Sequence, residues 1–123
     1  MTAADADQVF AALADPTRRE LLELLGGSPG RSASALAALV PVSRQAVAQH
    51  LAVLEECRLV QRRRAGREVL YQVQPDRLAE LARWLAGRAD AWRSRLELLK
   101  REAEAGPDQR GRDPATRQQA QVT

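Results

Sequence analysis

The chain has 123 residues and a net charge of +3, a size that fits one domain followed by a short tail. A hydrophobic share of 45% allows a core, and the single cysteine excludes a disulfide within the chain, which favours a reducing compartment. The acidic N-terminus has no apolar signal core, and no run of about 18 apolar residues occurs. We therefore expect a cytoplasmic protein that does not interact with membranes.

Positive charge is concentrated in one part of the sequence. Residues 58–74 contain five arginines and one glutamate, whereas the rest of the chain is close to neutral. A distribution of this kind favours one local anionic partner over general adhesion to acidic surfaces.

Two helices are predicted in the N-terminal part, over residues 5–14 and 16–25. Their apolar residues recur at the spacing of helix faces: Val9, Phe10, Leu13, Leu21, Leu22, Leu24 and Leu25. Asp15 is placed to cap the second helix, and Pro16 suits its first turn because the missing N–H has no partner there. The glycines and the proline of segment 26–31 end this helix.

The next two helices are separated by a very short turn. A helix over about 34–40, capped by one of the serines before it, is stopped by Pro41. Ser43 is a good N-cap for a longer helix over 43–57. Two helices this close together have the spacing of a helix-turn-helix.

A β-hairpin is predicted over residues 59–73. Apolar and polar residues alternate with a period of two in its second strand, and segment 65–67 supplies a glycine turn between the strands. The tip of this hairpin is rich in arginine.

The last helix is predicted over residues 76–104. Its apolar residues step by three and four: Leu78, Leu81, Leu85, Ala89, Trp92, Leu96, Leu99 and Ala103. A stripe of this length is too long for one small domain to cover, so part of it should pack against a second chain. Residues 105–123 have almost no apolar side chains and are expected to form a disordered polar tail. The fold class is therefore mainly α with a small β-hairpin (α+β), about five helices in a domain over 1–104.

The helix at 43–57 has an unusual polar side. On a wheel of roughly 100° per residue, long hydrogen-bonding side chains share one arc with small alanines. The arc begins with Arg44, Gln45, Ala48 and Gln49. A DNA major groove is about 12 Å wide and admits one helix, where Arg can bond guanine, Gln can bond adenine and an alanine methyl can contact thymine. Ser43 and the helix N-terminus suit a phosphate.

The hairpin arginines alternate between two sides of a strand, so not all of them can reach one surface. We expect Arg64 and Arg67, nearest the glycine turn, to contribute most to contacts with a phosphate ridge or a minor groove. The alternative is a solvated helix face beside a solvated hairpin. The order of short helix, tight turn, capped helix and arginine hairpin favours double-stranded DNA as the partner.

Two segments of the chain and its last helix resemble a known family. The segments "FAALADPTRRELLELL" and "VSRQAVAQHLAVLEECRLVQRRRAGREVLYQV", followed by a long last helix, are similar to ArsR-type winged helix-turn-helix transcriptional regulators over about residues 8–100. The resemblance implies a homodimer that is held by its first and last helices and that binds an inverted-repeat operator, usually as a repressor. It places the recognition helix at 43–55 and the wing at 62–71.

The residue pattern and the resemblance predict two sets of contact residues. The predicted DNA-binding residues are Ser43, Arg44, Gln45, Ala48, Gln49, His50, Arg62, Arg64 and Arg67. The predicted dimer-interface residues are Val9, Phe10, Leu13, Leu85, Trp92, Leu96 and Leu99.

The chain departs from the metal-sensing members of the family it resembles. Those members carry a Cys-x-Cys pair at the start of the recognition region, or His and acidic ligands on the last helix. Here the segment "SALAALVPVS" has no cysteine, and the last helix has no histidine. One cysteine and one histidine in the whole chain are too few for a soft-metal site, unless a dimer shares a site at Cys57 or His50. We expect a member that senses no metal and holds no cofactor.

Two single residues have competing interpretations. His50 falls among apolar positions, which favours a packed or hydrogen-bonded histidine that orients the helix or touches a phosphate over a pH or metal sensor. Cys57 also faces inward, which favours a structural thiol over a redox switch.

Other functions remain as alternatives. The long helix could dock a different protein, or a small organic ligand could bind at the dimer interface near Trp84 and Trp92 and gate DNA release. An enzyme is not expected, because no nucleophile and base are paired and no Gly-rich phosphate loop occurs.

Overall fold

The computed structural model describes residues 1–105, which fall into two compact units. The first unit is Met1–Trp84, and the second contains the described residues from 85 onward. The predicted polar tail, 105–123, lies outside the described residues except for Ala105.

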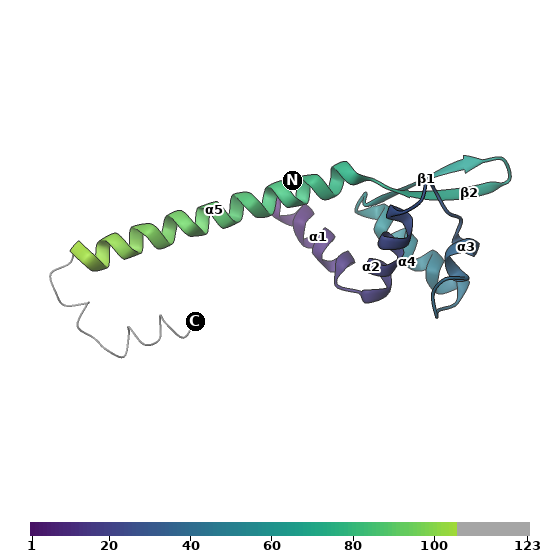
Figure 1. Ribbon diagram of the computed structural model, residues 1–123, viewed down its shortest axis with the longest axis horizontal. Helices are drawn as coiled ribbons and strands as arrows, with labels where there is room; N and C mark the ends of the chain where they lie inside the picture. Colours follow the sequence, from purple (N-terminus) through teal and green to yellow (C-terminus); the bar gives the residue numbers. More distant parts are fainter. Residues whose placement is uncertain (106–123) are drawn as a thin grey trace. The chain divides into compact units, whose positions relative to one another are not determined.

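Five helices and one hairpin make up this part of the chain (Figure 1). In order they are α1 (Ala3–Leu13), α2 (Pro16–Gly26), α3 (Ala33–Ala37), α4 (Arg44–Glu56), β1 (Val60–Ala65), β2 (Glu68–Val73) and α5 (Pro75–Ala105). The predicted α+β class, the number of helices and the hairpin are therefore confirmed.

Local hydrogen bonds explain where the helices begin. Asp15 caps α2 as predicted, because its Oδ1 accepts from the backbone N–H of Thr17 at 2.8 Å and of Arg18 at 3.2 Å. The Ser43 Oγ caps α4 by accepting from Ala46 N–H at 3.1 Å. By contrast, α1 begins at Ala3 and not at residue 5, since a capping box of Thr2 and Asp5 starts it earlier.

The predicted short helix is shorter in the structure. Helix α3 ends at Ala37, whereas the pattern predicted 34–40, and residues 38–40 form turns before Pro41. Its N-cap is Ser32, whose Oγ accepts from Ala35 N–H at 3.1 Å.

The hairpin has an antiparallel register in which Val60 pairs with Val73 and Ala65 with Glu68. Only two residues, 66 and 67, form the loop. Gly66 has a φ of 65°, a value that favours glycine, and it occupies the first position of a two-residue hairpin turn. An isolated bridge between Arg31 and Tyr71 ties the segment before α3 to β2.

The core of the first unit consists mainly of aliphatic side chains from all five helices, from β1 and from the segments between them. Its members are Ala6, Val9, Ala12, Leu21, Leu25, Leu36, Val40, Val47, Leu51, Leu54, Cys57, Leu59, Val60 and Leu81. Leu22 and Leu24, whose spacing placed them on the apolar face of α2, are only half-buried. Val53 stands at the edge of the apolar side of α4 and is 37% exposed.

One buried charged side chain joins the end of α4 to the start of α5. Arg77 is 5% exposed, and its Nε donates to the Cys57 carbonyl oxygen at 3.1 Å. Its Nη1 lies 3.5 Å from the Glu80 Oε2. Because Cys57 is the C-cap of α4, Arg77 satisfies a carbonyl that the helix itself leaves free.

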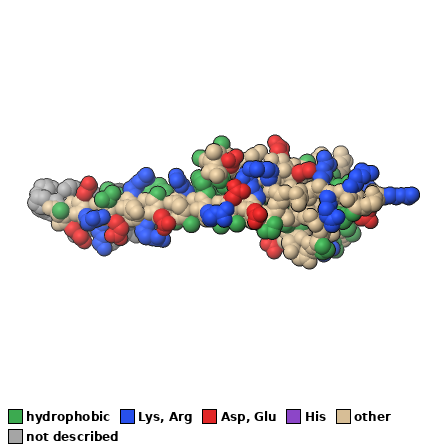
Figure 2. Space-filling view, turned by 90° about the horizontal axis from the view of Figure 1, so that it is seen from above, with side chains coloured by type: hydrophobic (Ala, Val, Ile, Leu, Met, Phe, Trp, Pro, Cys, Tyr) green, Lys and Arg blue, Asp and Glu red, His purple; other side chains and the backbone are tan. Residues whose placement is uncertain are grey.

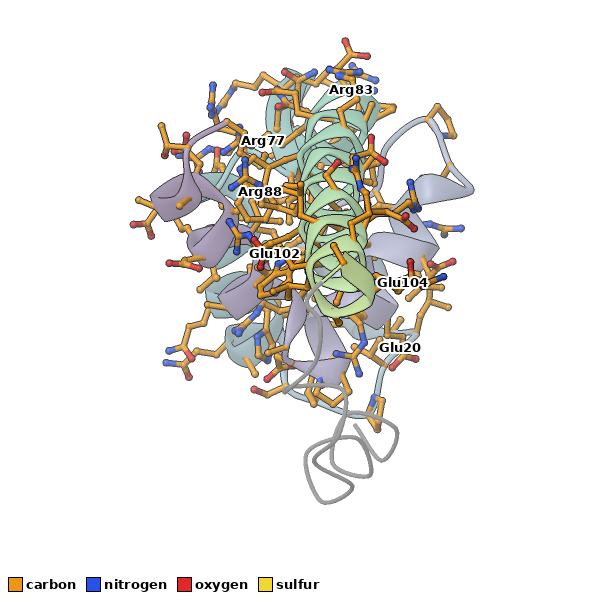
Figure 3. All side chains as sticks on the ribbon, turned by 90° about the vertical axis from the view of Figure 1, so that its left-hand side faces the viewer. Glu20, Arg77, Arg83, Arg88, Glu102 and Glu104 are labelled. Atoms are coloured by element: carbon orange, nitrogen blue, oxygen red, sulfur yellow. The ribbon has the colours of Figure 1, made fainter. Side chains whose placement is uncertain are left out.

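The part of α5 in the second unit exposes large apolar side chains. They are Leu85, Trp92, Leu96, Leu98 and Leu99. Figure 3 looks along α5 and shows the labelled Arg88 and Glu102 on one side of the helix, with Glu104 on the other. In the described residues, no helix combines the length and the apolar character that a membrane crossing requires.

Candidate nucleic-acid interface

Helix α4 presents a polar face to solvent. The predicted contact residues Arg44, Gln45, Ala48 and Gln49 are all exposed. On the opposite side of the helix, Val47, Leu51 and Leu54 are fully buried, with 0% exposure. The buried side seats the helix on the core of its own unit, so the exposed side is free to enter a groove of another molecule.

The hairpin carries four exposed arginines. The register places Arg62 and Arg64 on the strand face of Tyr71 and Val69, while Arg63 stands opposite Leu70. Figure 2 shows Lys and Arg side chains gathered over the hairpin that Figure 1 labels β1 and β2. These arginines and the polar face of α4 belong to the same compact unit.

Arg62 is already engaged within the chain. Its Nε lies 3.0 Å from the Glu55 Oε2, so the hairpin is paired to the second half of α4. The two side chains are 60% and 33% exposed, which makes this an ordinary surface ion pair of about 0 to 1 kcal/mol. Residue pattern alone did not indicate this pair, because Arg62 and Glu55 lie in different elements.

An open groove joins the helix-turn-helix to the hairpin. Its volume is about 500 Å³, and both Arg44, the first residue of α4, and Arg67, in the hairpin loop, line it. The remaining lining residues are Ser32, Ala33, Ser34, Glu68, Val69 and Tyr71. The sequence indicated both arginines separately, whereas Glu68 and the start of α3 were missed.

His50 is half-buried and hydrogen-bonded, as expected for a histidine that orients the helix. Its Nδ1 lies 3.3 Å from the Arg18 Nη1, so in the neutral ring Nδ1 is the acceptor. Arg18 also donates from Nε to the Ala12 carbonyl at 2.6 Å and from Nη2 to the Ala11 carbonyl at 3.2 Å. One guanidinium therefore joins the end of α1 to α4. No role was predicted for Arg18, since the residues it joins are far apart in the chain.

Comparison with known proteins agrees with this geometry. A family model described as a helix-turn-helix domain matches residues 13–63. The HTH-type transcriptional regulator Rv2034 of Mycobacterium tuberculosis is 48% identical over 75 residues, which are 61% of this chain and 69% of that protein. A solved ArsR-like transcriptional regulator from Rhodococcus sp. RHA1 is 44% identical with a TM-score of 0.75, covering 80% of this chain and 92% of that one. The chain belongs to the ArsR-type winged helix-turn-helix transcriptional regulators.

Two further relatives add detail about their own assemblies and roles. The transcriptional repressor SdpR of Bacillus subtilis is 29% identical over 79 residues, which are 64% of this chain and 87% of that protein. The homodimeric winged helix-turn-helix DNA-binding domain of Mb0332 from Mycobacterium bovis is 26% identical with a TM-score of 0.58, covering 71% of this chain and 80% of that one. The relatives are regulators and not enzymes, in agreement with the expectation for this chain.

The predicted dimer residues of this regulator differ in exposure. Val9 has 0% exposure and packs inside its own unit, so its side chain has no surface left for a partner. Phe10 is 39% exposed, and its ring centroid lies 6.2 Å from that of Trp84 in an edge-to-face arrangement. Leu13 is half-buried.

Cys57 is buried at the end of α4. Its Sγ donates to the Leu54 carbonyl oxygen at 3.5 Å, and burial raises the pKa of the thiol. A thiol that stays protonated at neutral pH is a poor nucleophile, which supports a structural role. Over residues 1–105, no group of three or more His, Cys, Asp or Glu side chains is arranged to hold a metal ion.

Proposed function

We propose that this regulator is a homodimeric repressor of an inverted-repeat operator. Helix 43–55 enters the major groove, and the wing at 62–71 lies on the backbone or in the minor groove. The observation that carries the proposal is the exposed polar face of α4, seated by three fully buried side chains and flanked by the exposed wing arginines. In this proposal, residues 1–104 form the DNA-binding and dimerisation domain.

The exposed stripe on α5 supports the dimer. Leu85, Trp92, Leu96 and Leu99 are 44%, 59%, 61% and 57% exposed, although they recur on one helix face. Exposed apolar residues in a contiguous row mark an interaction surface. A second copy of the chain covers such a row by symmetry, and a two-fold dimer explains an inverted-repeat operator. The Mycobacterium bovis relative is titled homodimeric, and the Bacillus subtilis relative is named a repressor.

The first test is fluorescence anisotropy with the DNA upstream of the protein's own gene and with scrambled DNA, at several salt concentrations. We expect tight binding to one sequence that weakens as salt rises, because phosphate contacts release counterions. Binding that is equally weak on both DNAs would contradict the proposal for this upstream region.

Variants separate base contacts from backbone contacts. Gln45→Ala should lose about 1–3 kcal/mol on the operator and little on scrambled DNA, as expected for a paired base contact. Arg64→Ala should weaken both DNAs alike and reduce the salt slope by about 1. If the two variants behave identically, this division of roles is wrong.

Sedimentation tests the assembly. A stable homodimer is expected, in which the α5 stripe is covered by the second copy. A monomer over the whole micromolar range would instead favour the alternative in which α5 docks a different protein. The gating of DNA release by a small organic ligand at the dimer interface is compatible with the homodimer and stays a prediction.

A further inference from the structure

The groove between the helix-turn-helix and the wing contains two arginines that come from distant parts of the chain. Arg44 is the first residue of α4, and Arg67 is the second residue of the hairpin loop. Both line the groove of about 500 Å³ that also borders the start of α3. The tertiary fold thus places two permanent positive charges on one open concave surface.

Neither guanidinium is used inside the described residues 1–105. No ion pair and no side-chain hydrogen bond engages Arg44 or Arg67 there, whereas Arg18, Arg62 and Arg77 all have partners. Their exposure and lack of partners leave their N–H donors available to an anion. A phosphodiester is an anion that a guanidinium binds through two parallel N–H donors.

Arg44 also stands at one edge of the polar arc of α4, well away from the two glutamines. At roughly 100° per residue, Gln45 and Gln49 stand about 100° and 140° around the helix from Arg44. The groove that Arg44 lines is bordered by the wing, and neither glutamine is among its lining residues. Arg44 is also in the first turn of a helix of 13 residues, where the helix dipole favours a negative ligand.

We infer that Arg44 and Arg67 together hold one stretch of the DNA sugar-phosphate backbone in this groove, so Arg44 is a backbone residue and not a base reader. This changes the role that the sequence pattern gave to Arg44 and rests on the proposed function. Base reading is left to Gln45, Ala48 and Gln49. The recognition helix and the wing then contact the backbone of the same DNA strand. These two contacts set the depth and angle at which α4 enters the major groove.

Glu68 lines the same groove and carries a charge opposite to that of the two arginines. Its carboxylate is exposed and makes no ion pair within the described part of the chain. A carboxylate beside a bound phosphate is repelled by it, so Glu68 should weaken binding to every DNA sequence. Glu68→Gln is expected to bind operator and scrambled DNA about two- to five-fold more tightly, the effect of one exposed charge.

The test measures anisotropy on operator and scrambled DNA over a range of salt for Arg44→Gln, Arg67→Gln and the double variant. Each single variant should weaken both DNAs, leave their affinity ratio unchanged within about two-fold and reduce the salt slope by about 1. The double variant should lose less affinity than the product of the two single losses, because both residues hold the same stretch of backbone. Arg83→Gln removes an exposed arginine of α5 outside the groove and serves as the charge-matched control, with no change in slope expected.

The outcomes distinguish this inference from the proposed function. If Arg44→Gln lowers the ratio of operator to scrambled affinity and leaves the salt slope intact, Arg44 reads a base and the inference is wrong. If the losses of binding free energy in Arg44→Gln and Arg67→Gln are fully additive in the double variant, the two arginines do not hold the same stretch of backbone and the inference is also wrong. If wild-type protein shows no salt-dependent binding to either DNA, the proposed function fails, and the assignment fails with it.

Discussion

Helix α4 and the part of α5 in the second unit have the same kind of amphipathic pattern, but the apolar face is buried in α4 and exposed in α5. In α4 the apolar side chains Val47, Leu51 and Leu54 have 0% exposure. In α5 beyond Trp84, the apolar side chains of the stripe are 44% to 61% exposed. An apolar stripe therefore shows that a helix face needs a cover, but it does not show which molecule provides the cover.

The difference follows from what surrounds each helix. Helices α2 and α3 and strand β1 pack against α4, so this helix is held by its own chain and only its polar face is left for DNA. The stripe on α5 is left to a second copy of the chain in the proposed dimer. The same physical pattern thus orients a recognition element in one region and provides an interface in the other.

The largest effect is expected from deleting core volume under α4. Leu51→Ala should lower the free energy of unfolding by about 2–5 kcal/mol, because it leaves a cavity in a fully buried site. Urea denaturation at two protein concentrations measures this, and the loss should not depend on concentration. Leu98→Ala, at an exposed position, should change the value by less than about 0.5 kcal/mol. Equal losses in both variants would break the comparison.

A charge on the stripe should act on assembly. Leu96→Glu is expected to weaken self-association by about 2 kcal/mol or more, since it places a carboxylate in the apolar centre of the proposed interface. Leu98→Glu is the matched control, because Leu98 is 56% exposed, close to the 61% of Leu96, and lies on the opposite face of the helix. Sedimentation velocity should show a monomer only for Leu96→Glu. Dissociation by both variants would argue against a specific face.

Loss of the Arg77 hydrogen bond that joins α5 to the end of α4 should have a moderate effect on the free energy of unfolding. Arg77→Met keeps much of the buried volume but removes the hydrogen bond to the Cys57 carbonyl oxygen. The unsatisfied carbonyl should cost about 1–3 kcal/mol in thermal or urea unfolding. Arg83→Met, at an exposed position of the same helix, should be close to neutral. A neutral result for Arg77→Met would mean that this bond does not hold the end of α4.

The smallest effect on the free energy of unfolding is expected from changing Asp15, the N-cap of α2, which is one of the helices that cover α4. The backbone N–H of Arg18 and that of Thr17 lower the pKa of Asp15 below its usual value, against the opposing effect of desolvation. A lowered folded-state pKa means that this contribution is present above the unfolded-state pKa and is lost as pH falls through the folded-state pKa. Asp15→Asn keeps a capping oxygen without the charge, so it should flatten the acid side of the curve of unfolding free energy against pH. An unchanged acid limb in Asp15→Asn would contradict the assignment.

Much of the local structure followed from the sequence because its causes are local. Asp15 and Ser43 cap helices whose N–H groups lie two or three residues away, and Gly66 permits the backbone of a two-residue turn. The polar arc of α4 is a property of helix geometry, so its exposed contact residues were also predictable. In each of these cases, the interactions that determine the local structure involve only residues that are close in the sequence.

The tertiary structure decided what depends on residues far apart in the chain. It buried Val9, which had been predicted at an interface, and left Val53 of α4 37% exposed. It also paired Arg62 with Glu55, joined Arg18 to His50, and placed Arg44 and Arg67 in one groove. Periodicity specifies which way a side chain points from its own element, whereas its neighbours depend on how the elements pack. That packing decided which of these residues are buried, which are paired and which lie together in one groove.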